Sequence, residues 1–235
     1  MKQIFFTFFI FTSLIILLSS CRKDADTKEM SDEEAVESIE QFVAEESGGY
    51  AEYLVQLIEI YEQTNNNCNY SSDSTITRAR NIGLTTYSST ANYAYTLSCV
   101  NGIPDILTIT TSASRDFDAP RVSASASTTT SNTTLSNLIT GTAFEYNGTY
   151  ALNGDITSKI RQRGAFDYNF SMTSSRIMID KSTQKITGGT ATVTLAGGVT
   201  GPNNIPFSYT GTITFNGNGT ATLVLQGNNY TITIS

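Results

Sequence analysis

Hydrophobic positions follow three successive patterns along the chain. Residues 4–18 are almost continuously apolar, interrupted only by two threonines and a serine. Residues 31–63 carry apolar side chains at helical spacing, whereas residues 64–235 alternate apolar and polar side chains with a period of two. The helical period is typical of an amphipathic helix and the period of two is typical of a half-buried strand. The patterns therefore predict a leader, a helical segment and a β domain.

The helical segment has a clear start and an internal break. Ser31 is followed by Asp32, Glu33 and Glu34, a capping-box pattern in which acids also favour the positive end of the helix dipole. A helix should therefore begin at Ser31. Gly48-Gly49 interrupts the apolar period before it resumes. We expect two amphipathic helices, or one kinked helix.

Hairpins in series are predicted in the β domain. Alternation is clearest over 207–215, where aromatic and aliphatic residues alternate with serine and threonine. The segment 216–219 (Asn-Gly-Asn-Gly) then predicts a turn, and Asn147-Gly148 is the strongest two-residue hairpin signal in the chain. Counting such runs gives about nine to eleven strands joined in antiparallel order, a meander.

A sheet with one apolar face must bury that face against a second layer. Because the helical segment also has an apolar stripe, we expect a mainly β fold: a strongly curved sheet, or half-barrel, with the helices packed against it or across one end. A closed up-and-down barrel is an alternative. An integral outer-membrane barrel is a third, although the chain has no Trp for an aromatic girdle.

The leader has the features of a secretory signal. Lys2 gives a positive start, an apolar run of about 15 residues follows, and small residues end it at Ser19-Ser20. A permanent transmembrane helix is the alternative, but such a helix needs roughly 20 apolar residues. We therefore expect the leader to be removed.

The tetrapeptide Leu18-Ser19-Ser20-Cys21 resembles the lipobox of bacterial lipoproteins. The resemblance implies cleavage before Cys21 and acylation of its thiol and of the new amine, and two or more acyl chains give stable membrane anchoring. The following segment, 22–26 (Arg-Lys-Asp-Ala-Asp), resembles the surface-export signal of Bacteroidota lipoproteins, from which Ala25 departs. The residue after Cys21 is Arg22 and not the aspartate of the proteobacterial inner-membrane retention signal, so comparison with that sorting rule implies an outer-membrane anchor.

These observations divide the chain into four parts. We expect a signal peptide over 1–20, a lipidated tether over 21–30, an acidic amphipathic helical segment over 31–63 and an antiparallel β domain over 64–235. The formal net charge is -7. Eleven acids and no Lys or Arg lie between residues 29 and 62, whereas residues 64–235 hold ten Lys plus Arg and eight Asp plus Glu. Most of the negative charge is therefore in the helical segment.

Cysteine usage fits a chain that leaves the reducing cytoplasm. Besides Cys21 only Cys68 and Cys99 are present. An even pair in an oxidising compartment favours a disulfide, and two free thiols are the alternative.

Composition excludes several kinds of catalytic site. The chain has no histidine, so Ser-His-Asp, Cys-His and His-ligated zinc sites are ruled out. Paired carboxylates could still hydrolyse glycosides. The candidate acids are Asp105, Asp116, Asp118, Glu145, Asp155 and Asp167. The run Arg115-Asp116-Phe117-Asp118 could bind calcium, but acids that solvate a turn are the more common explanation. We expect no cofactor and no metal.

Two further groups are candidates for binding. Lys159, Arg161 and Arg163 alternate along one predicted strand and form a basic stripe, with Arg78 and Arg80 as a smaller one. Such a stripe could contact an anionic ligand or the acidic helices, but is more often a solvated face. The group Tyr87, Tyr93 and Tyr95, with Asn66 and Asn67, could stack on a sugar, but strand tyrosines are more often core residues.

Together these features predict a non-catalytic lipoprotein of the outer membrane, a β-rich binding or structural module. The expected partners are the membrane, through the lipid, and a glycan, an apolar ligand or an envelope protein. Nucleic acid is not expected at this net charge. A carrier that holds an apolar ligand in a half-barrel and a glycan hydrolase with paired carboxylates are the alternatives.

Overall fold

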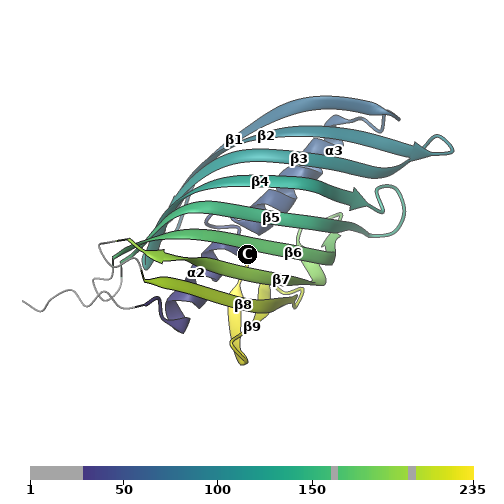
Figure 1. Ribbon diagram of the computed structural model, residues 1–235. Helices are drawn as coiled ribbons and strands as arrows, with labels where there is room; N and C mark the ends of the chain where they lie inside the picture. Colours follow the sequence, from purple (N-terminus) through teal and green to yellow (C-terminus); the bar gives the residue numbers. More distant parts are fainter. Residues whose placement is uncertain (1–28, 160–163, 201–204) are drawn as a thin grey trace, which may run out of the picture.

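A single antiparallel sheet dominates the computed structural model, which describes residues 29–159, 164–200 and 205–235. Ten strands follow one another in sheet order β1 to β10, each paired with the next (Figure 1). The strands are β1 Tyr70–Ile82, β2 Thr85–Val100, β3 Ile103–Asp118, β4 Val122–Ser136, β5 Ala143–Ser158, β6 Ala165–Asp180, β7 Ile186–Val199, β8 Pro206–Phe215, β9 Thr220–Leu225 and β10 Asn228–Thr233. The predicted meander and its number of strands are confirmed.

Two helices precede the sheet, α2 (Asp32–Val43) and α3 (Tyr50–Gln63). The predicted capping box at Ser31 is present: its hydroxyl accepts from the backbone N–H of Glu34, and the Glu34 carboxylate accepts from the backbone N–H of Ser31. Between the helices the chain turns tightly at Gly49, where an added Cβ would lie 2.6 Å from the carbonyl oxygens of Phe42 and Ala44. Of the two predicted alternatives, two helices or one kinked helix, the first is confirmed.

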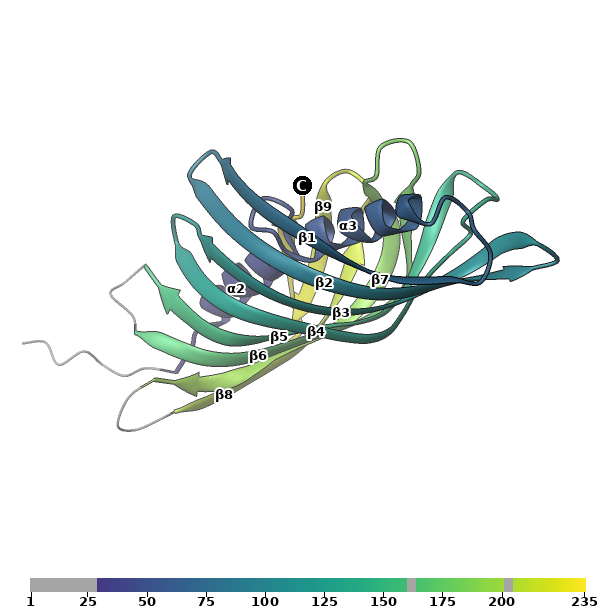
Figure 2. The ribbon, with the colours of Figure 1, turned by 90° about the horizontal axis from the view of Figure 1, so that it is seen from above.

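The helices lie along the concave side of the curved sheet (Figures 1 and 2). The ring of Phe42 from α2 stacks on Tyr168 of β6 with centroids 4.7 Å apart, and Tyr50 from α3 meets Tyr146 of β5 edge-on at 5.6 Å. Alternate residues of each strand join this core, so that the apolar stripe of each helix and the apolar face of the sheet bury one another. The expected curved sheet with the helices packed against it is confirmed.

The predicted hairpin at Asn147-Gly148 is wrong. β5 runs through both residues, and the register with β6 shifts between Tyr146 and Gly148, which marks a bulge instead of a turn. A Cβ on Gly148 would lie 2.9 Å from the hydroxyl of Thr133, so glycine permits the close approach of β4. The Asn147 side chain accepts a hydrogen bond from the backbone N–H of Arg176 at 2.9 Å. The Asn-Gly pair, which is typical of tight turns, here forms a bulge inside a long strand.

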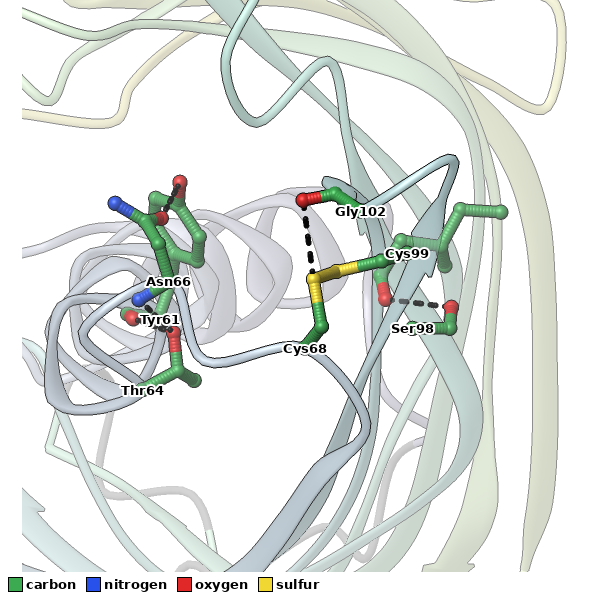
Figure 3. Close-up of a disulfide and its surroundings, with 8 residues drawn as sticks. Tyr61, Thr64, Asn66, Cys68, Ser98, Cys99 and Gly102 are labelled. Carbon is green, nitrogen blue, oxygen red and sulfur yellow. Dashed lines mark hydrogen bonds between the residues drawn. A yellow bond between two sulfur atoms is a disulfide. The ribbon is translucent and has the colours of Figure 1, made fainter.

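A disulfide joins Cys68 to Cys99 with their Cα atoms 5.5 Å apart (Figure 3). It ties the segment after α3 to the end of β2. The hydroxyl of Tyr61, in the last turn of α3, donates to the side-chain oxygen of Asn66 in this segment at 2.7 Å. The predicted pairing is confirmed, and it fixes the exit of the helical segment to the β2–β3 end of the sheet.

Candidate functional site

The acidic helices and the sheet meet through charged groups. Arg78 and Arg80 project from the concave side of β1, where burial alternates along the strand. The carboxylate of Glu52, 1% exposed, lies 3.5 Å from the Arg78 guanidinium and 3.3 Å from that of Arg80. Arg78 also pairs with Glu59. The smaller basic stripe of the sequence therefore contacts the chain's own acidic helices, one of the roles considered for such a stripe.

A buried polar network continues from this contact into the core. The Gln56 amide donates to Glu52 at 3.3 Å, and the hydroxyl of Tyr93 donates to the Gln56 carbonyl oxygen. Burial raises the pKa of Tyr93 well above its usual range. It also raises the pKa of Tyr87 to about 12, with a contribution from the nearby charge of Glu52. Both tyrosines stay protonated near neutral pH, and the Tyr93 hydroxyl acts as a hydrogen-bond donor in the core.

The tyrosine group considered as a sugar-stacking surface is not a surface. Tyr87, Tyr93 and Tyr95 are 4%, 1% and 5% exposed and face the helices. These tyrosines are core residues, which is the more common role of tyrosine in strands.

An open cleft of about 420 Å³ lies at the β6–β7 and β8–β9 turns and is the candidate binding site. It takes residues from the α2–α3 turn, both strand turns and the C-terminus. The Lys185 ammonium lies 2.6 Å from the Glu45 carboxylate. Gln184 and Asn218 add side-chain amides to the lining. We call the cleft formed by these residues the end cleft. Its volume is within the range of small-ligand pockets.

Asp180 in the end cleft is held in its ionised form. One carboxylate oxygen accepts from the hydroxyl of Ser182 at 2.6 Å and from the backbone N–H of Thr183 at 2.8 Å. These hydrogen bonds lower the pKa of Asp180 to about 2. A carboxylate with so low a pKa is a weak proton acceptor, since general acid–base catalysis favours a pKa near the working pH. The end cleft is thus better suited to hydrogen bonding than to proton transfer.

The convex face of the sheet carries hydroxyl groups in register. One row of threonines crosses β7 to β10, each paired with the next: Thr190, Thr214, Thr222 and Thr231. Thr149 and Thr173 pair in the same way on β5 and β6, with their hydroxyls 3.3 Å apart. This face offers many hydrogen-bonding groups to solvent and few large apolar ones, as the alternation predicted.

The candidate acids lie apart from the end cleft. Five of the candidate acids are exposed, and none of these five lines the cleft: Asp105, Asp116, Asp118, Asp155 and Asp167. Glu145 is partly buried and lies 3.5 Å from the Arg176 guanidinium. Asp155 and Asp167 face each other as direct partners on β5 and β6. In the described residues no cluster of three or more acid or cysteine side chains could hold a metal ion.

The Arg115–Asp118 run is a strand end and not a loop, so the interpretation as turn acids is wrong. Asp116 and Asp118 project from the convex face of β3, and Arg115 projects into the core. Lys159 pairs with Asp118 and donates to the Ala119 carbonyl at 2.9 Å. The other members of the predicted basic stripe, Arg161 and Arg163, lie outside the described residues, as does Cys21, the predicted lipidation site.

Sequence reasoning missed Arg115 in the interior and the groups that line the end cleft. Arg115 was considered only as part of an acidic run, although its alternation with Ala113 and Phe117 places it on the apolar face. The residues Glu45, Asp180 and Lys185 had no local signal, because the cleft assembles them from distant segments.

No protein-family model matches the chain, and no curated protein and no solved structure is significantly similar to it. Within the described residues, no helix has both the length and the apolar character needed to cross a membrane.

Proposed function

We propose that this protein is a non-catalytic, lipid-anchored module of the bacterial outer membrane that binds a polar ligand or an envelope partner through the end cleft and the convex face. The observation that carries the proposal is that α2 and α3 already cover the apolar concave face (Figure 2). What the domain offers to a partner is therefore polar: the hydroxyl rows of the sheet and a cleft bordered by an ion pair and a fixed carboxylate.

The membrane part of the proposal rests on Cys21 and its lipobox, and it has a direct test. Replacing the acylated thiol removes the acyl chains on which stable anchoring depends. We expect Cys21→Ser to move the protein from the membrane fraction to the soluble fraction. Retention of this variant in membranes would show that the apolar run over 4–18 anchors the chain instead.

The binding part is tested on a glycan array with two lysine variants. Lys185 lines the end cleft, whereas Lys181 lies nearby outside it and donates to the Thr140 carbonyl at 2.8 Å. Lys185→Gln should weaken the retention of a bound glycan and Lys181→Gln should leave it unchanged. Equal loss in both variants, or none in either, would remove the cleft from the proposal. An array without any retained glycan would leave an envelope protein as the partner.

A carrier of apolar ligands is the second candidate, and one observation favours it. The helical segment meets the sheet mainly through side chains. Among the described residues, one backbone–backbone hydrogen bond joins this segment to the end of the sheet, from the N–H of Glu45 to the Ile234 carbonyl at 3.0 Å. The segment could therefore leave the concave face without breaking a strand pair. A carrier should copurify with an apolar ligand that mass spectrometry detects after extraction, and its absence would count against this function.

A further inference from the structure

Arg115 is a charged residue in the apolar core. It lies in β3, is 3% exposed, and projects toward the turn between α2 and α3. One terminal nitrogen donates to the carbonyl oxygen of Gly48 at 2.7 Å. The guanidinium carbon lies 5.3 Å from the ring centre of Phe117 and 6.0 Å from that of Phe42. The side chain thus joins the sheet to the helix turn.

The remaining donors of this guanidinium are not satisfied by the protein. Nε and Nη2 have no hydrogen-bond partner among the described residues. In that part of the chain Arg115 also forms no ion pair, since the buried carboxylate of Glu52 is taken by Arg78 and Arg80. Aromatic faces attract a cation but do not accept its in-plane N–H groups. Burying a charge without a counter-charge is costly, so a partner of opposite charge is expected here.

A small cavity lies beside these donors. Its volume is about 20 Å³, and its lining includes Arg115, Gln56, Thr111 and Tyr150. A cavity of roughly 10–15 Å³ by this measure holds one water molecule. The space therefore fits a single small species and excludes a carboxylate ligand of several heavy atoms.

We propose that this cavity binds one halide-sized monovalent anion, chloride in a chloride-containing medium, which accepts the free N–H groups of Arg115 and supplies its missing counter-charge. A water molecule would accept the same hydrogen bonds but would leave the charge uncompensated in a medium where charge interactions are strong. The anion would strengthen the link between β3 and the helix turn, so that helix docking depends on the anion in solution.

Thermal unfolding of the full-length protein in detergent tests the proposal at constant ionic strength. Sodium chloride or bromide replaces sodium gluconate, whose anion is too large for the cavity. We expect a saturable rise in melting temperature of roughly 5–10 °C when the halide is at about 100 times its Kd. The rise should be absent in Arg115→Met and present in the control Arg121→Met, because Arg121 is 61% exposed and pairs with Glu37 at the surface.

Anomalous diffraction from crystals grown in bromide gives an answer that does not depend on a variant's folding. A bromide peak within hydrogen-bond distance of Nε or Nη2 of Arg115 would support the proposal. A water at that position in bromide would overturn it, as would a melting temperature that is the same in halide and gluconate.

Discussion

Among the ion pairs between the helical segment and the sheet in the described residues, the contact of Glu52 with the two arginines of β1 has the most buried carboxylate. Glu52 is 1% exposed, and Arg78 and Arg80 are 26% and 39% exposed. At the effective dielectric constant of about 20 that suits protein sites, Coulomb's law gives roughly 5 kcal/mol for each pair at 3.3–3.5 Å, before desolvation is subtracted. Removing one partner of a fully buried pair costs about 3–5 kcal/mol.

The Glu52→Gln variant should cost less than that range, because both arginines reach solvent and have other acidic partners. We expect a loss of about 2–3 kcal/mol in the free energy of unfolding, between the values for exposed and fully buried pairs, because water screens the two arginines only in part. This corresponds to a fall in melting temperature of roughly 5–10 °C for a chain of this size. Denaturant unfolding followed by circular dichroism measures it.

Glu59→Gln is the matched control for this prediction. Glu59 also pairs with Arg78 but is 33% exposed, so its loss should cost no more than about 1 kcal/mol. If Glu52→Gln proves no more destabilising than Glu59→Gln, the buried ion pairs do not hold α3 in the concave face. The helices would then be retained by apolar packing alone.

Three further outcomes are expected. Replacing both Cys68 and Cys99 with serine should lower the free energy of unfolding by about 3–4 kcal/mol in the chain-entropy model, measured by denaturant titration, and an unchanged midpoint would contradict the structural role of the disulfide. Asp155→Asn should raise stability by a few tenths of a kcal/mol or more, most at low salt, because it removes the repulsion from Asp167 across the strands, and a loss of stability would contradict this. The pKa of Asp180 is below its usual value near 4, so the stability that its carboxylate contributes is present above pH 4 and is lost as pH falls toward 2. When the free energy of unfolding is measured across this pH range, Asp180→Asn should lack this loss; the same loss in the variant would contradict the role of Asp180.

Much of the architecture was predictable because its signals are local. The hydroxyl and acid of a capping box are three residues apart, and the observed helix begins where Ser31 and Glu34 indicate. Strand alternation has a period of two, so the buried face of β8 could be assigned from residues 207–215 alone. The disulfide could be predicted from the even pair of cysteines together with the oxidising compartment expected for the chain.

Features that depend on strand register could not be predicted. Asn147-Gly148 has the composition of a tight turn, but β5 pairs with both neighbouring strands before and after these residues, so the chain continues there with a bulge. The end cleft joins the α2–α3 turn, two strand turns and the C-terminus, and no sequence pattern relates them. For Arg115 the alternation indicated an inward side chain, but its lack of a partner follows only from the packing around it.

Chemical labelling of a thiol on the inner side of α3 tests most directly whether the helices fill the concave face. Leu57 is fully buried there, whereas Gln63 is exposed at the end of the same helix. In a Cys21→Ser background, a thiol-specific reagent should label Leu57→Cys roughly a thousandfold more slowly than Gln63→Cys, the factor that an opening free energy of about 4 kcal/mol gives. Comparable labelling rates in the folded protein would contradict the account, because the concave face would then be open to ligands.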